Sequence, residues 1–540
     1  MCKICDDAAA RGQPRPSHLH QNDTTAATAA PESVASPPRR QFFKASAAVA
    51  GVAATAALAG CGGGNAIAAE TAPEGVGQPG RRTLIRGGAV LSMDDAVGNF
   101  AVGDVLLEGK TIVAVGPNLS AAGAAVIDAT GMIVMPGFID THHHQFETAL
   151  RGQLADSVLL PGGTYNEGVN NYFETILGNF AGKYRPQDVF INEVYGSLAQ
   201  LDAGVTTVMD VSQIHHTPEH TDAAVEGLVT GGRRSVLGYF EGDYTRANYA
   251  YPADARRLKS RYFSSDDQLL SMVMGGEIYL PGYQTAWAIG RELDIPIALH
   301  VVGTFGMAPT FDAIANNTRA AAAARDPNQV TMGDDNIFIH MTGMSELGWD
   351  VAAEVGAHVS LAVPIEMQMR HGTPPTQKAL DRGMKPSLST DVECTMTADM
   401  FSQMRFVMTL QRMFANEKAL AGQPYPDLLK SIDAIRFATI DGARGLKLDH
   451  KVGSLTPGKE ADIVLLDATA LNVAPLNNVP GAVVTLMERN NVSTVLVAGQ
   501  IKKWRGKLVG HDMERLRREL EDSRDYLFNA AGVTRNLFRV

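Results

Sequence analysis

The sequence predicts a parallel α/β barrel between two β-rich segments. From about residue 136 to residue 449, short apolar runs typical of strands alternate with longer runs whose apolar residues have helical spacing. Such alternation is typical of strand–helix–strand units around a parallel sheet. Before and after this stretch, Gly-containing turns separate short apolar runs, as in β-hairpins. With 540 residues, 45 % of them hydrophobic, the chain can bury a large core.

Each element is assigned to a segment. The predicted barrel strands are TTVMDV, SVLGYF, PIALHVV, NIFIHM, AHVSLAV and PSLSTD. The predicted helices are DVFINEVYGSLAQLDAG, YQTAWAIGRELD, SELGWDVAAEVG and ADMFSQMRFVMTLQRMFANEKAL. We expect β-rich segments at 83–135 and 450–510, the barrel at 136–449 and a helical extension at 511–540.

Residues 1–61 are expected to be a targeting segment that is not part of the folded domain. The Arg-Arg pair at 39–40, followed by an Ala- and Val-rich stretch, resembles a twin-arginine export signal. The stretch ends in LAGC at 58–61, which resembles a lipobox, so we expect a periplasmic or envelope protein, lipid-anchored at Cys61. A disordered extension and ordinary signal cleavage near 66–68 are the alternatives. Residues 62–82 are expected to be a flexible tether.

Charge and cysteine content narrow the class of partner. The net charge is -11 and the chain has no long basic run, so we do not expect it to bind nucleic acid. We expect a small-molecule partner instead. Four cysteines are too few for a disulfide scaffold. Cys2 and Cys5 form a lone CxxC without a second pair, which favours an incidental leader pair over a zinc knuckle.

The most informative stretch is VMPGFIDTHHHQFETALRG, at 134–152. An apolar run ends at Asp140 and is followed by His142 and His144. Because side chains alternate along an extended chain, both imidazoles can face one metal ion while His143 points elsewhere.

This stretch resembles the first barrel strand of the amidohydrolase superfamily, which ends in HxH after a PGxID lead-in. The trailing LRG is similar to the branch containing cytosine, guanine and S-adenosylhomocysteine deaminases and triazine hydrolases. The resemblance covers about residues 83–509 and implies a (β/α)8 TIM barrel with a composite β-sandwich built from both flanks. It further implies that His300, ending PIALH, is a metal ligand, that His340 ends the sixth strand, and that Asp391 follows the eighth.

These residue types also fit one chemistry. Three neutral imidazoles and a carboxylate leave Zn²⁺, or Fe²⁺, one open position for water, whose pKa falls from about 15.7 to about 7. Asp391 can take the water's proton and pass it to a leaving nitrogen, while His340 polarises the substrate oxygen. The resemblance implies that relatives with two metal ions bridge them with a carbamylated lysine from the fourth strand. We take RSVLGYFEGD as the fourth-strand region. It contains no lysine, so we expect a single metal ion.

One departure from the family pattern affects the reaction. The deaminases of this branch carry HxxE on strand five, but here Gly303 stands where the acid is expected. Glu366 and His371, after the seventh strand, are the candidate substrate-binding groups, and Glu366 is the candidate replacement acid. Glu241 is a weaker candidate. The alternatives are a solvated loop acid for Glu366 and a turn residue for His371.

Two interpretations stay open for His215, His216 and His220. They can be ligands of a second metal ion, or they can belong to a loop that enters a helix, which Pro218 in an early helical turn favours. Cys394 is expected to be a small packed side chain.

The predicted function is hydrolysis of a non-peptide C–N bond, in an amide, urea, carbamate or amidine, by metal-activated water. Deamination of an aminated heterocycle and triazine-type dechlorination are the alternatives within the family. An alternative of another class is a catalytically silent, lipid-anchored binding protein, which the intact ligand set disfavours. Resemblance also implies a homo-oligomer.

Overall fold

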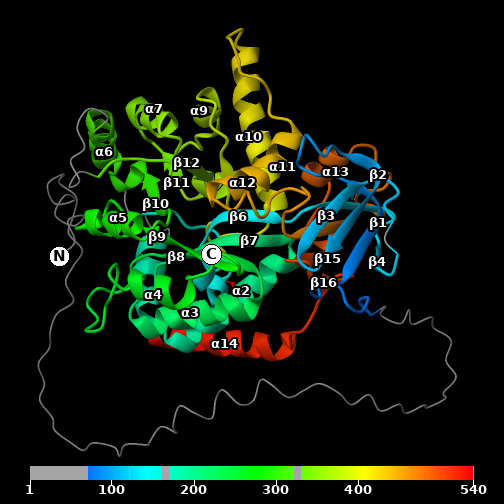
Figure 1. Cartoon of the computed structure of the whole chain (residues 1–540). Helices are drawn as coiled ribbons and strands as arrows, with labels where there is room; N and C mark the ends of the chain where they lie inside the picture. Colours follow the sequence, from blue (N-terminus) through cyan, green and yellow to red (C-terminus); the bar gives the residue numbers. More distant parts are fainter. Residues whose placement is uncertain (1–70, 121, 161–169, 322–329, 539–540) are drawn as a thin grey trace, which may run out of the picture. The chain divides into compact units, whose positions relative to one another are not determined.

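The computed structural model describes residues 71–120, 122–160, 170–321 and 330–538 (Figure 1). The predicted export signal, Cys61 and most of the predicted tether therefore lie outside the described residues. Within those ranges, no helix combines the length and the apolar character needed to cross a membrane.

An eight-stranded parallel sheet forms the barrel, and consecutive strands are neighbours throughout. Its strands are β6 (Phe138–His143), β7 (Val205–Ser212), β8 (Arg234–Tyr239), β9 (Leu270–Gly275), β10 (Ile297–Val302), β11 (Asn336–Thr342), β12 (His358–Leu361) and β13 (Ser387–Leu388). A parallel bridge between His143 and Asp391 joins the first strand to the chain that follows the last. The predicted TIM barrel is confirmed.

Strand residues are buried on both faces because helices cover the outside. One face supplies an apolar cluster that includes Ile139, Met209, Val236, Val273 and Ile337. The other face packs into the large core shared with the surrounding helices. This double burial explains why the strands read as nearly continuous apolar runs in the sequence.

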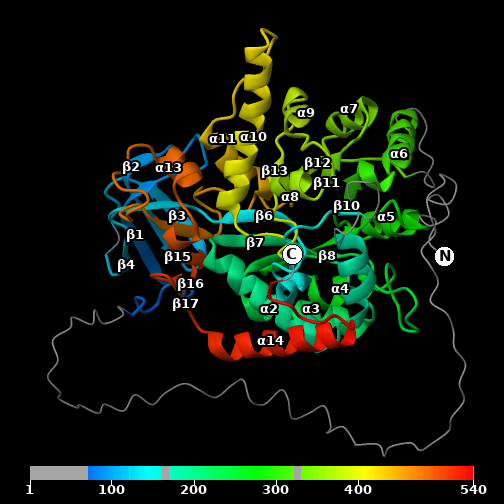
Figure 2. The ribbon, with the colours of Figure 1, turned by 180° about the vertical axis from the view of Figure 1, so that it is seen from behind.

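Most of the helices follow the strands around the barrel (Figures 1 and 2). The helices are α2 (Pro186–Asp202), α3 (Pro218–Gly231), α4 (Ala255–Tyr262), α5 (Tyr283–Glu292), α6 (Ala308–Ala321), α7 (Glu346–Glu354), α8 (Val363–Gln368), α9 (Thr376–Asp381), α10 (Met400–Leu420), α11 (Ser431–Phe437), α12 (Ile440–Gly445), α13 (Val479–Thr485) and α14 (Met513–Ala530). Of these, α13 lies beside α11 at the second sheet described below. The helices predicted from DVFINEVYGSLAQLDAG, YQTAWAIGRELD, SELGWDVAAEVG and ADMFSQMRF onward are α2, α5, α7 and α10.

The assignment of the fourth barrel strand was wrong. RSVLGYF forms β8, which is the third strand of the barrel, and the fourth is β9, with the sequence LSMVMG. Its two methionines and the glycine pair at 275–276 give little of the β-branched signal by which the other strands are recognised. β9 also contains no lysine, and Glu277 follows it.

Strands from both flanks form one nine-stranded mixed sheet. They are β1 (Arg82–Val90), β2 (Phe100–Glu108), β3 (Thr111–Gly116), β4 (Ala125–Asp128), β5 (Met132–Pro136), β14 (Ile463–Asp467), β15 (Val492–Val497), β16 (Gln500–Trp504) and β17 (Lys507–Leu508). β5 and β14 pair antiparallel from Pro136↔Ile463 to Met132↔Asp467 and so join the two flanks. β5 runs directly into β6, so this sheet is continuous in sequence with the strand that carries the His pair.

A buried ion pair connects the barrel to this sheet. Arg234, the first residue of β8, is 1 % exposed. Its guanidinium donates to Asp462 Oδ2 at 2.9 Å and to Glu460 Oε2 at 2.6 Å, just before β14. Elsewhere on the barrel, α14 runs along α2 (Figures 1 and 2), and the Arg185 guanidinium stacks on the Tyr526 ring at 3.3 Å.

Replacing Arg234 should test the strength of this connection. Arg234→Met leaves Asp462 buried without its partner, and removing one member of a buried pair costs about 3–5 kcal/mol of unfolding free energy. Denaturant unfolding gives this value directly. Arg256→Met, which breaks an exposed pair with Glu292, is the matched control and should cost about 1 kcal/mol or less. Equal losses for the two variants would contradict the role assigned to Arg234.

Candidate metal centre and active site

Barrel closure places Asp391 beside the His pair. The Asp391 amide donates to the His142 carbonyl at 3.0 Å, and the His144 amide donates to the Asp391 carbonyl at 2.8 Å. These bonds join the end of β6 to the chain just after β13. Residues far apart in the sequence therefore meet at the carboxyl ends of the strands, where TIM-barrel enzymes hold their active sites.

Three imidazole nitrogens converge on one point. His142 Nε2 lies 3.0 Å from His144 Nε2 and 3.2 Å from His300 Nε2, and the His144 and His300 nitrogens are 3.3 Å apart. The structure thus brings together the three histidines predicted from β6 and β10. His143 points away from them, with Nδ1 3.0 Å from the Asp391 carbonyl oxygen.

Hydrogen bonds on the far side of two rings fix which nitrogen carries the proton. His144 Nδ1 donates to the Val211 carbonyl at 2.8 Å, and His300 Nδ1 donates to Glu277 Oε1 at 2.5 Å. The Nε2 atoms of these neutral rings consequently carry lone pairs that point at one another. Such lone pairs repel unless a cation lies between them, so the donor set fits a metal ion.

Asp391 completes the group and also reaches His340. Its Oδ1 lies 3.7 Å from His142 Nε2 and 3.6 Å from His144 Nε2, while Oδ2 lies 3.4 Å from His340 Nε2. His340 and Asp391 both have left-handed backbones, with φ of 69° and 61°. Non-glycine residues rarely adopt this conformation, and it is often found where a site needs a defined side-chain direction.

Burial keeps three of the four histidines neutral. It lowers the pKa of His142, His144 and His340 well below the ordinary value. Burial also opposes protonation of His300, but the Glu277 carboxylate outweighs it and raises the pKa of His300. Burial raises the pKa of Asp391 to about 7. Neutral imidazole is the form that binds a metal ion.

Glu366 and His371 both contact the surroundings of His340. Glu366, in α8, is fully buried: its Oε1 accepts from the Ala362 amide at 2.9 Å and lies 3.2 Å from His340 Nδ1. The His371 ring packs edge-on against His340 with centroids 4.6 Å apart. Among the described residues, Glu366 Oε2 and both ring nitrogens of His371 have no hydrogen-bond partner.

Glu277 is a candidate functional residue that the sequence prediction missed. It is fully buried, and its Oε1 accepts from both Nδ1 and the backbone amide of His300. The signal in the sequence was an acid directly after an apolar run and two glycines. It was overlooked because that run was not recognised as a barrel strand.

The backbone at the end of β11 packs closely against Gly303. A Cβ at this position would lie 3.0 Å from Gly343 Cα and 3.2 Å from the Thr342 carbonyl oxygen. The chain leaving β11 therefore occupies the space beside strand five from which a side chain at residue 303 would start.

The histidines at 215–220 are held by the protein itself. His215 contacts Thr221 and the Gly238 carbonyl oxygen, His216 contacts the Ala181 carbonyl oxygen and the Asp243 amide, and His220 contacts Thr217 and the Tyr184 carbonyl oxygen. Every ring nitrogen is used, so none is available to a metal ion. The loop interpretation holds, and Pro218 begins α3.

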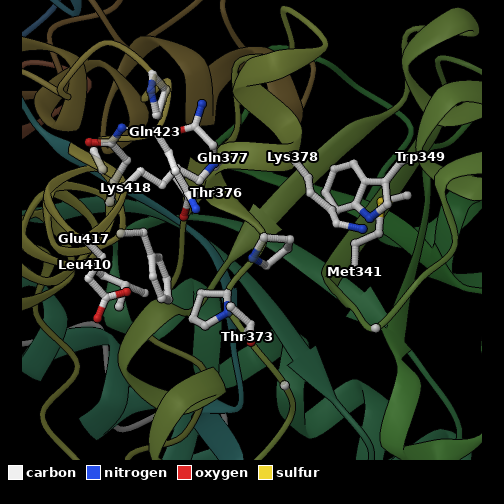
Figure 3. A pocket seen from close by; sticks show the side chains of 18 residues that line it. Met341, Trp349, Thr373, Thr376, Gln377, Lys378, Leu410, Glu417, Lys418 and Gln423 are labelled. Atoms are coloured by element: carbon white, nitrogen blue, oxygen red, sulfur yellow. Dashed lines mark hydrogen bonds between the residues drawn. The ribbon is translucent and has the colours of Figure 1, made fainter. Parts of the chain in front are cut away.

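A cavity of about 590 Å³ lies near the end of β11 (Figure 3). Its lining includes Met341 and Gly343, which follow His340, and residues of α9 and α10. Figure 3 shows Trp349 and Met341 near one end and Gln423 near the other. None of the converging histidines lines this cavity, so we assign it no part in the chemistry.

His215 should make the protein less stable in acid. Burial lowers the pKa of His215 to about 3, whereas the unfolded value is about 6.5. As the pH falls below about 6.5, the unfolded chain binds the proton first, and the folded state loses up to about 1.4 kcal/mol per pH unit until about pH 3. His215→Gln removes this titration. The unfolding free energy of the wild type should therefore fall relative to that of the variant from pH 7 to pH 4, and a constant difference would contradict the assignment.

The chain is similar to two known deaminases over most of its length. The chain is 26 % identical over 435 residues to 5'-deoxyadenosine deaminase of Methanothermobacter thermautotrophicus, covering 79 % of this chain and 94 % of the relative. It is 24 % identical to 5-methylthioadenosine/S-adenosylhomocysteine deaminase of Desulfitobacterium hafniense, covering 80 % of this chain and 96 % of the relative.

Solved structures show the same fold. An adenosine deaminase from Xanthomonas campestris with bound zinc superposes with a TM-score of 0.66 at 22 % identity, covering 83 % of this chain and 98 % of that one. Atrazine chlorohydrolase from Arthrobacter aurescens complexed with zinc gives a TM-score of 0.65 at 21 % identity, covering 82 % and 100 %. The model of the amidohydrolase family matches residues 133–502. Since this match spans more than half of the chain, the protein belongs to the amidohydrolase family.

Proposed function

We propose that the protein hydrolyses a non-peptide C–N bond of a small molecule with water activated by one divalent metal ion. The observation that carries the proposal is the convergence of three histidine Nε2 atoms within 3.0–3.3 Å of one another, next to Asp391. His142, His144, His300 and Asp391 would hold the ion. Zn²⁺ is the first choice because two fold neighbours contain zinc, and Fe²⁺ is the second.

A bound divalent ion supplies a nucleophilic water at neutral pH, since it lowers the pKa of that water from about 15.7 to about 7. Asp391 is the proposed proton carrier. Its carboxylate faces the His pair through Oδ1 and His340 through Oδ2. It can therefore accept a proton from the attacking water and deliver it to the leaving nitrogen, which departs poorly as an anion.

His340 is proposed to stabilise the oxygen that becomes negative. Burial raises the pKa of Glu366 well above its ordinary value, so this carboxyl holds its proton and donates it to His340 Nδ1. The neutral His340 ring then carries its own hydrogen on Nε2, which is directed toward Asp391 and the reaction centre. A preoriented donor at this point stabilises a tetrahedral adduct more than it stabilises the substrate. We propose that Glu366 Oε2 and the His371 ring contact the substrate, because the described residues offer these atoms no partner.

An amide, urea, carbamate or amidine is the first proposed substrate class, because Gly303 provides no acid to protonate a ring nitrogen. Deamination of an aminated heterocycle is the second candidate. It is favoured by the two deaminase relatives, which align over 94 % and 96 % of their own lengths.

Removing the metal ion or the proton carrier should abolish activity. Dialysis against a chelator should stop ammonia release across a panel of amides, ureas and aminoheterocycles, and added Zn²⁺ should restore it. Asp391→Asn removes the proton acceptor and should lower turnover by about a hundredfold or more. Glu226→Gln, on the exposed side of α3, is the control and should keep full turnover. A purified protein that binds no stoichiometric metal, or an Asp391→Asn variant with unchanged turnover, would refute the mechanism.

Glu277 should set the metal affinity without touching the metal ion. Glu277→Gln keeps the shape of the side chain but loses the charge that fixes the His300 tautomer. Loss of such a partner typically weakens metal binding by about 10–100-fold. Competition with a chromophoric chelator measures the zinc affinity, and Glu226→Gln again serves as the control. An unchanged affinity in a correctly folded variant would exclude the positioning role of Glu277.

A further inference from the structure

A second group of polar side chains gathers at the mouth of the barrel, beside the proposed metal site. Gln213 directly follows β7, Glu241 lies two residues after β8, and Tyr279 lies four residues after β9. Because the carboxyl ends of neighbouring parallel strands share one rim, these residues from three consecutive strands meet. The proposed mechanism uses none of them.

Glu241 is held at the centre of this group by one of its two oxygens. Oε1 accepts from Gln213 Nε2 at 3.0 Å and from Tyr279 Oη at 2.5 Å. Oε2 is shielded from solvent and has no hydrogen-bond partner among the described residues. No arginine or lysine of the described ranges forms an ion pair with this carboxylate, so its charge is balanced only by two neutral donors.

This carboxylate is close to the centre that carries the chemistry. Phe240, the residue before Glu241, packs its ring against the His300 ring with centroids 5.9 Å apart. Glu277 Oε2 also has no partner in the described part of the chain. One wall of the barrel mouth thus presents two carboxylates, each with an unused oxygen, next to a metal ligand.

Aromatic rings lie next to the acidic wall. The Tyr279 ring packs against Phe305 with centroids 6.1 Å apart, and Phe305 packs against Phe173 at 6.3 Å. All three rings are partly exposed. An apolar surface beside an unbalanced carboxylate is complementary to a flat ring that carries positive charge or several N–H donors.

We infer that Glu241 is a specificity-determining residue that binds a cationic, N–H-rich group of the substrate, as in an amidine or a protonated aminoheterocycle. The inference rests on the proposed function, because it assigns a substrate class to that same site. A buried carboxylate oxygen without a partner is costly, and an N–H⁺ donor from the substrate offsets this cost. A neutral substrate of the same shape would leave the charge unbalanced. Glu241 therefore favours a positively charged substrate over a neutral one, while the metal site acts on the C–N bond.

Equilibrium binding of two matched probes tests the inference. Benzylamine is cationic at neutral pH, benzyl alcohol is its neutral isostere, and neither offers a hydrolysable C–N bond. Calorimetry on the zinc-loaded full chain should show that benzylamine binds about tenfold or more tightly than benzyl alcohol. Glu241→Gln should remove this preference by weakening benzylamine about tenfold, while benzyl alcohol binding and zinc content stay unchanged. Glu226→Gln should change none of these values.

Equal binding of the two probes to the wild type, or an equal loss of both in Glu241→Gln, would overturn the assignment. The wild-type comparison decides even if the variant fails to fold. Because binding is measured without turnover, the two proposals fail separately. A protein that binds benzylamine through Glu241 but releases no ammonia from any substrate would refute the hydrolase and leave the charge selection standing.

Discussion

The two backbone hydrogen bonds between β6 and the chain after β13 are the constraint on which the rest of the site depends. They place Asp391 opposite His142 and His144 and hold its backbone in the left-handed conformation. Asp140 reinforces the same junction, because its Oδ1 accepts from the amides of His142 at 3.2 Å and Thr390 at 3.1 Å. One buried carboxylate thus fixes two of the three chain segments that carry the proposed metal ligands, and the position of Asp391 relative to the His pair follows from how the barrel closes.

A buried polar network beneath this junction makes the constraint rigid. Gln200 Nε2 donates to Asp140 Oδ2 at 2.7 Å, and Arg233 donates to Gln200 and, at 2.6 Å, to Gln145 Oε1. Burial lowers the pKa of Arg233 to about 10, so it stays charged at neutral pH and balances nearby acids. A network of this kind is costly when incomplete and specifies one arrangement when its members are satisfied. We interpret it as the reason that the ends of β6 and β13 meet in a single register.

The residues that could be predicted from the sequence share one property: each ends a recognisable apolar run. His142, His144, His300 and His340 come at the ends of apolar runs, so their position on the barrel rim could be foreseen. β9 was missed because its methionines and glycines do not resemble a strand, and Glu277 was missed with it. Glu366 was named as a candidate, but the sequence could not exclude a solvated loop acid, because its burial depends on the six-residue helix α8 and on tertiary contacts that no local pattern encodes. Sequence periodicity predicts which residues lie at the ends of strands. It does not predict which other side chains will form hydrogen bonds to them.

In three acids around the proposed metal site, the two carboxylate oxygens have different environments. In Glu241, Glu277 and Glu366, Oε1 is bound by the protein, while Oε2 has no partner among the described residues. The bound oxygen fixes the carboxylate in place, so the other oxygen is presented in a defined direction at little further entropic cost. Three such oxygens around neutral imidazoles would be strongly unfavourable in an apolar interior if nothing positive were bound. A divalent ion at the histidines and a cationic substrate group at Glu241 would each offset part of this cost. We therefore assign the metal ion and the substrate's positive charge to different residues at the mouth of the barrel.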